Sequence, residues 1–107
     1  MKRAFLAVAV LAGLLGAAPQ GQTNVVHIRD DKFVPASMTI KAGDHVTFVN
    51  DDDDAHTATA DDRSWDSEGL NMGQKWSHAF TKSGKITYHC TVHPFMKGML
   101  IVAGDKK

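Results

Sequence analysis

The sequence predicts an all-β fold, a small sandwich or barrel of short strands, from residue 24 to the end of the chain. Apolar residues there recur at every second position, which is the period of a strand with one buried face. Glycine, aspartate and other turn-forming residues separate these apolar runs at short intervals. No stretch after the first 23 residues shows the period of an amphipathic helix, and a chain of 107 residues allows one domain.

Three strands are expected before residue 51. Val26 and Ile28 alternate with polar neighbours in the first of them, and Val46 and Phe48 do so in the third. In order along the chain, the strands cover residues 24–29, 38–41 and 45–50, with turns at 30–32 and 42–44.

The second half of the domain opens with polar segments. The aspartates at 51–54 and the stretch 61–74 are expected to be loops, while residues 56–60 fit either a strand or the edge of a loop. In the strand that ends at Cys90, the residues Ile86 and Tyr88 share a face with that cysteine. The last three expected strands cover residues 75–80, 85–90 and 98–103.

The first 18 residues have the layout of a secretory signal peptide. A basic start, Met1-Lys2-Arg3, precedes an apolar run at 4–18 that ends in small residues. This run is shorter than the roughly 20 residues that span a bilayer, so an uncleaved membrane anchor is the weaker alternative. We therefore expect cleavage between residues 17 and 23, a mature domain at 24–107, no membrane span, and a periplasmic or secreted location.

Charge and cysteine content exclude several classes of protein. The formal charge of the whole chain is zero, and removal of Lys2 and Arg3 leaves 10 basic against 12 acidic residues, a net charge of −2. Such a balance offers no basic surface for nucleic acid. A single cysteine excludes an internal disulfide, although an exported domain meets an oxidising environment. We expect a monomer whose thiol is occupied by a metal.

The segment around Cys90 carries the metal-binding signal. His93 follows this cysteine by three positions, and Met96 follows His93 by three more. A thiolate, imidazoles and a weak axial thioether are the ligand set of an electron-transfer copper site. A second histidine has to come from elsewhere, and His56 is the best candidate because it follows a strand that ends at Asn50.

This segment resembles a known family. His93-Pro94-Phe95-Met96, preceded by Tyr88-His89-Cys90-Thr91, is similar to the ligand loop of the cupredoxins, and most closely to that of the amicyanins. The segments 42–50 and 84–88 are similar to the family as well. The resemblance implies a Greek-key β-sandwich that binds one type 1 copper ion through His56, Cys90, His93 and Met96. It also implies that His93 lies near the surface in an apolar patch with Pro94 and Phe95.

From this resemblance we expect an electron carrier that cycles between Cu(II) and Cu(I) and moves single electrons between periplasmic partners. A c-type cytochrome or a dehydrogenase would serve as a partner docking around His93, Pro94 and Phe95. The alternative is a protein that stores or delivers copper, for which a His-rich or Met-rich tail would argue. An enzyme is not expected, since Cys90 and His93 share one tight loop and no oxyanion-hole signal exists.

The chain departs from the family on both sides of its first histidine. Many cupredoxins have Pro before it and Asn after it, where this chain has Ala55 and Thr57. The Asn normally ties the two ligand loops together. We expect Thr57 to replace it by offering its backbone N–H to the sulfur and its hydroxyl to the neighbouring loop.

The remaining histidines, methionines and aspartates have plainer interpretations. By strand parity, three histidines face outward and His78 is half-buried. Met38, Met72 and Met99 are expected to fill core or surface space. The acidic residues 51–54, with Asp61 and Asp62, fit a solvated loop, a surface that steers a basic redox partner, or a calcium site that lacks an EF-hand pattern. The outward histidines are His27, His45 and His89.

Overall fold

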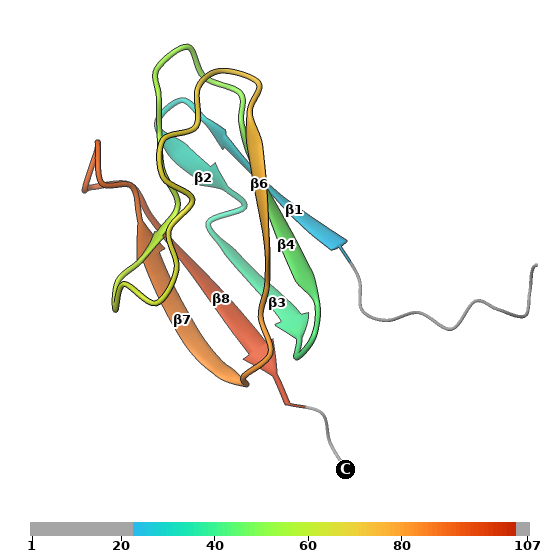
Figure 1. Ribbon diagram of the computed structural model, residues 1–107. Helices are drawn as coiled ribbons and strands as arrows, with labels where there is room; N and C mark the ends of the chain where they lie inside the picture. Colours follow the sequence, from blue (N-terminus) through green and yellow to red (C-terminus); the bar gives the residue numbers. More distant parts are fainter. Residues whose placement is uncertain (1–22, 105–107) are drawn as a thin grey trace, which may run out of the picture.

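The computed structural model describes residues 23–104, which form two four-stranded sheets packed face to face (Figure 1). One sheet has the strand order β2-β1-β4-β6 and the other has the order β3-β8-β7-β5. The strands are β1 (Thr23–Arg29), β2 (Lys32–Val34), β3 (Ser37–Lys41), β4 (His45–Asn50), β5 (Thr59–Ala60), β6 (Lys75–Ala79), β7 (Gly84–His89) and β8 (Lys97–Ala103). Within this part of the chain there is no helix, and so none that is long and apolar enough to cross a membrane.

The first sheet is built around the parallel pair β1 and β4, in which Val26 lies opposite Phe48. A two-residue turn joins β1 to β2, and both of its residues, Asp30 and Asp31, have positive φ angles of 55° and 58°. Left-handed backbone at both central positions is the conformation that matches the twist of a tight hairpin. Aspartate tolerates it better than most residues because its side chain is short and polar.

The second sheet pairs β8 with β3 in parallel and with β7 in an antiparallel register. Tyr88 of β7 lies directly opposite Gly98 of β8. A Cβ atom on Gly98 would lie 2.5 Å from Cε2 and from the phenol oxygen of Tyr88, so the missing side chain provides the space that the tyrosine ring occupies.

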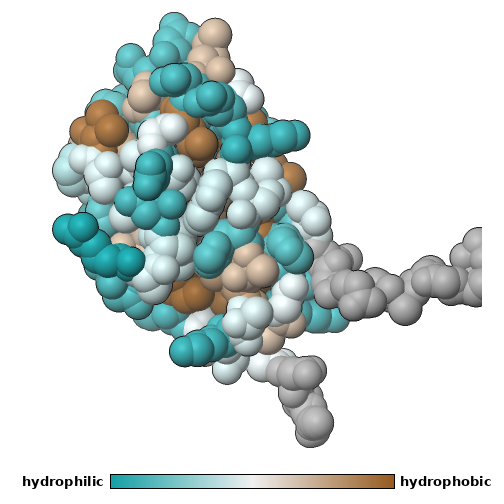
Figure 2. All heavy atoms as spheres, in the orientation of Figure 1, coloured by the Kyte–Doolittle hydropathy of each residue, from teal (hydrophilic) through white to brown (hydrophobic). Residues whose placement is uncertain are grey.

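The core lies between the two sheets and confirms the alternation expected from the sequence. The inward apolar residues of β1 and β4 are fully buried, as are Tyr88 of β7 and Leu100 of β8. Figure 2 shows one face of the outer surface, on which hydrophilic and intermediate residues predominate and hydrophobic ones gather in small groups. The core residues with an exposed fraction below 2% are Val26, Ile28, Val46, Phe48, Ala58, Ala60, Tyr88, Cys90 and Leu100.

Several strand bounds differ from the expectation, and β7 ends at His89, one residue before Cys90. Residues 32–34 form the short strand β2, because the turn at Asp30-Asp31 folds them back onto β1. Only Thr59 and Ala60 of the stretch 56–60 form a strand, while β6 ends at Ala79. The predicted signal peptide lies outside the described residues, and both it and the domain boundaries stay predictions.

His78 makes the stability of the fold depend on pH. It lies on the inner face of the edge strand β6, stacked on Trp76 and Trp65 with ring centroids 5.1 and 5.8 Å away. Burial, together with the charge of nearby His45, lowers the pKa of His78 below its ordinary value of 6.5. The unfolded chain therefore binds more protons than the folded one just below pH 6.5. The stability that His78 contributes is present above that pH and is lost as the pH falls through the lowered folded-state pKa.

We expect the free energy of unfolding, measured by urea denaturation, to decrease between about pH 7 and about pH 5. His78→Gln cannot titrate, so its profile should be flatter over the same range. Parallel profiles for the two proteins would contradict the role assigned to His78.

Candidate metal centre

Cys90 directly follows β7 and lies on its inner face, with no exposed surface. The chain then turns back on itself. The N–H of Met96 donates to the carbonyl of His93 at 2.8 Å, and the N–H of Cys90 donates to the carbonyl of Met96 at 3.2 Å. These two hydrogen bonds close the loop between β7 and β8, so that Cys90, His93 and Met96 meet at one end of the sandwich. Met96 is 2% exposed and belongs to the same buried cluster as Cys90.

His56 reaches this end of the sandwich from the loop that follows β4. Its backbone pairs with Leu70, donating at 3.1 Å and accepting at 2.8 Å. The side chain is fully buried, and its Nδ1 lies 3.7 Å from Sγ of Cys90. His56 is thus brought to the cysteine from a position 34 residues away in the sequence.

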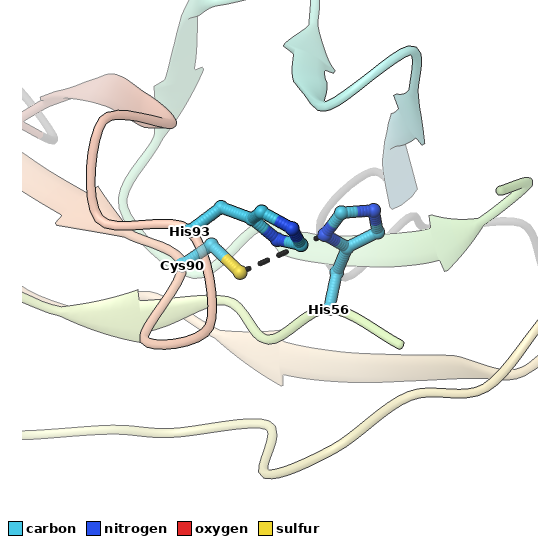
Figure 3. A group of neighbouring side chains, drawn as sticks. All are labelled: His56, Cys90 and His93. Atoms are coloured by element: carbon cyan, nitrogen blue, oxygen red, sulfur yellow. Dashed lines mark hydrogen bonds between the residues drawn. The ribbon is translucent and has the colours of Figure 1, made fainter. Parts of the chain in front are cut away.

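His93 completes the cluster. Its ring centroid is 4.9 Å from that of His56. One donor atom each from His56, Cys90 and His93 lie within 4.8 Å of one another (Figure 3). The Nδ1 atom of His93 is buried and has no hydrogen-bond partner among the described residues. A buried imidazole nitrogen without a partner is costly unless another group, such as a metal ion, binds it.

Thr57 ties the two loops of the cluster together, as expected from the sequence. Its N–H donates to Sγ of Cys90 at 3.4 Å. Its hydroxyl oxygen accepts a 2.9 Å hydrogen bond from the N–H of Thr91. The sulfur therefore receives a hydrogen bond from a backbone donor, and the expectation for Thr57 is confirmed.

Asp52 positions His56 from the side opposite the sulfur. Its carboxylate lies 2.9 Å from Nε2 of His56 and accepts the N–H groups of Asp30 at 2.8 Å and of Asp31 at 3.1 Å. Partial burial alone would raise the pKa of Asp52, but the hydrogen bonds from Asp31, Asp30 and His56 outweigh it and the pKa is lowered. An ionised Asp52 accepts the proton on Nε2 and leaves Nδ1, which faces the sulfur, as the free lone pair.

Asn50 holds the loop that carries Asp52. This residue is fully buried, and its amide donates to the carbonyls of Leu70 at 2.7 Å and Asp54 at 2.8 Å. Its side-chain oxygen accepts the N–H of Asp52 at 2.9 Å. The sequence analysis missed both Asn50 and Asp52 as parts of the centre. The available signal was the inward strand parity of Asn50, a polar residue at the end of a buried alternation.

The other candidates lie where the sequence placed them. Asp61 accepts from His89 at 2.6 Å, and Asp51 pairs with His27 at 2.8 Å, so both histidines face away from the cluster. His45 is exposed, and so is Met72. Met38 packs against the core, and Met99 is half-buried.

Comparison with known proteins agrees with this geometry. The model of the cupredoxin-like domain matches residues 2–102. The chain is 40% identical to amicyanin-alpha of Methylorubrum extorquens over 108 residues, which cover 92% of this chain and 90% of that protein. It is 31% identical to the amicyanin of Paracoccus denitrificans over 83 residues, which cover 73% of this chain and 63% of that relative.

Solved structures share the fold. The copper(I) form of an amicyanin variant superposes with a TM-score of 0.69 at 30% identity, covering 75% of this chain and 81% of the other. For the purple cupredoxin of Nitrosopumilus maritimus the TM-score is 0.71 at 26% identity, with 75% and 99% covered. A copper nitrite reductase of Thermus scotoductus matches with a TM-score of 0.73 at 28% identity, over 78% of this chain but 23% of the enzyme. The chain therefore belongs to the cupredoxin family of copper proteins and is similar to its amicyanin members.

Proposed function

We propose that this protein is a periplasmic electron carrier with one type 1 copper site, formed by His56, Cys90, His93 and Met96. The observation that carries the proposal is the convergence of three donor atoms within 4.8 Å, two of them from fully buried residues, with Nδ1 of His93 unpartnered among the described residues. Thiolate, imidazole and thioether donors together suit copper better than zinc, whose structural sites use Cys and His without a thioether.

The surroundings of the cluster favour electron transfer over copper delivery. A bound copper ion supplies one-electron redox chemistry. The protein holds the donors in place through the Thr57 bonds to Cys90 and Thr91 and through the Asp52 bond to His56. Such fixed positions reduce the rearrangement that accompanies electron transfer, whereas delivery requires ligands that release the ion readily. Solved amicyanin variants exist in both a copper(I) and an oxidised form.

The N-terminal pattern bears on where the protein works, and the surface around His93 bears on where its partner docks. The signal-peptide pattern at residues 1–18 supports export to the periplasm. His93 is half-buried beside exposed Phe95, and we propose that electrons leave through His93 to a redox protein that docks there. The protein itself carries electrons and is not proposed to be an enzyme.

A titration of the metal-free mature domain with Cu(II), followed by visible absorption, tests the proposal. An intense blue thiolate-to-copper band should saturate at one equivalent, bleach with ascorbate and return with an oxidant. A pale spectrum with tight binding would instead indicate copper handling and would contradict the electron-carrier proposal.

Asp52→Asn is expected to raise the reduction potential of the copper-loaded protein. Loss of an outer partner of a ligating histidine weakens metal binding by about 10–100-fold. The loss falls mainly on Cu(II), the more highly charged form, so the potential should rise by about 60–120 mV for a one-electron couple. Cyclic voltammetry measures this shift.

Asp53→Asn is the matched control, because it removes the same charge from the next position, which is exposed. Its potential should change much less than that of Asp52→Asn. Equal shifts in the two variants would show that charge alone, and not the bond to His56, sets the potential.

A further inference from the structure

The surface around His93 combines an apolar part with a charged part. Phe95 is 69% exposed and Val92 is 54% exposed, and the Phe95 ring lies 5.8 Å from the His93 ring. In Figure 2, hydrophobic residues are exposed at the upper left, where Figure 1 places the loop between β7 and β8, and hydrophilic residues border them. An exposed apolar group with a polar border is the composition of a protein-binding surface.

Two carboxylates lie directly beside the same histidine. One oxygen of Asp31, one oxygen of Asp54 and one ring nitrogen of His93 all lie within 4.8 Å of one another. Asp31 comes from the β1–β2 turn and Asp54 from the loop after β4, so the fold brings them together from separate segments. Carboxylates held this close repel each other, and a cation placed between them relieves the repulsion.

The aspartates at 30–31 and 51–54 divide into two groups by their partners. Asp51 is paired with His27 and Arg29, and Asp52 is bonded to His56 and to the β1–β2 turn. Within residues 23–104, by contrast, no lysine or arginine forms an ion pair with Asp30, Asp31, Asp53 or Asp54, although Asp31 lies 3.5 Å from Nε2 of His56. Negative charge without a lysine or arginine partner is therefore concentrated at the edge of the apolar surface that surrounds His93.

We propose that the redox partner docking at His93 is a basic protein, with lysine or arginine side chains around an apolar centre that covers Phe95 and Val92. This inference rests on the proposed electron-carrier function. Cationic side chains of the partner contact Asp31 and Asp54, next to the histidine through which the electron leaves. Opposite charges at such a rim raise the rate of association and make it dependent on ionic strength.

Small redox complexes of opposite charge test the charge requirement. The reduced, copper-loaded protein is mixed in a stopped-flow instrument with tris(phenanthroline)cobalt(III), a cation, or with hexacyanoferrate(III), an anion. Ionic strength is varied from about 10 to about 200 mM, over which the screening length falls from about 30 Å to less than 10 Å. The rate constant for the cation should fall with added salt, and that for the anion should rise.

Two variants with the same change in net charge show where on the surface charge affects the rate constants. Asp54→Asn removes one negative charge beside His93, and Ser83→Lys adds one positive charge in the turn before β7, at the opposite end of the sandwich. Asp54→Asn should slow the reaction with the cation several-fold at low ionic strength and speed the reaction with the anion. Ser83→Lys should change both rates little. The reduction potential of Asp54→Asn is measured beside these rates, because a change in driving force would alter the rates with both oxidants in the same direction.

Mitochondrial cytochrome c is a lysine-rich redox protein. Its rate constant should respond to added salt and to the two substitutions in the same direction as that of the cobalt complex. Equal effects of Asp54→Asn and Ser83→Lys, or a rate with the cation that does not fall with salt, would overturn the basic-partner proposal while leaving the electron carrier intact. If neither oxidant removes an electron from the reduced protein in a reversible reaction, both proposals are overturned.

Discussion

Cys90→Ser is expected to abolish the intense visible absorption of the copper-loaded protein completely while leaving it folded. The colour of such a site comes from a thiolate bound to copper, and the chain has no second cysteine. The substitution keeps a small side chain at a fully buried position, so the packing around it changes little. Copper affinity should fall by more than the roughly 100-fold that loss of an outer partner costs. Absorption and a copper titration measure the two effects.

The histidines provide the comparison for this prediction. His45→Ala removes an exposed histidine and should keep the blue band, whereas His56→Ala should lose it. A blue Cys90→Ser protein would rule out the ligand assignment. Loss of colour in His45→Ala but not in His56→Ala would show that the second histidine has been chosen wrongly.

Gly98→Ala is expected to lower the stability of the fold substantially, and by much more than Gly104→Ala. The new Cβ would lie 2.5 Å from Cε2 and the phenol oxygen of Tyr88, a ring that is 1% exposed and in edge contact with Phe33 and Phe48. Overpacking of a filled core costs about 1–3 kcal/mol and occasionally more. In a domain of this size each kcal/mol lowers the melting temperature by about 4–8 °C. Calorimetry of the metal-free protein measures the shift.

Gly104→Ala is the control, since its Cβ would meet only Ser83, at an ordinary contact distance of 3.6 Å. It should change the melting temperature little. If the two variants melt at the same temperature, then Tyr88 moves aside without cost and the close packing on Gly98 does not stabilise the sandwich.

The arrangement of Tyr88 also illustrates what local patterns miss. Its inward direction follows from alternation with Ile86 and Cys90, and the sequence predicts it correctly. The register that sets it over Gly98 follows from the pairing of β7 with β8, which a single strand does not encode. The same limit applies to the β1–β2 turn, because the N–H groups of Asp30 and Asp31 find their acceptor in Asp52, more than 20 residues away.

Within the candidate metal centre, the position of the loop that carries Cys90, His93 and Met96 was predictable because it is local. These three residues occupy one tight turn, and His56 lies at the same end of the sandwich, as expected from the end of the preceding strand; their role as ligands stays a prediction. The separate roles of the aspartates at 51–54 were not predictable in the same way. One of its members orients His56, one pairs with His27 and Arg29, and one lies beside His93.

Periodicity and short-range spacing thus specify the strand faces and the loop that carries Cys90, because both depend on residues close together in the chain. Three of the four aspartates at 51–54 acquire distinct roles only when the two sheets close and bring the β1–β2 turn, the loop after β4 and the loop before β8 to one end. Hydrogen bonds act over about 3 Å, so the partners of a carboxylate are decided by which segments meet there, and no local pattern records that meeting.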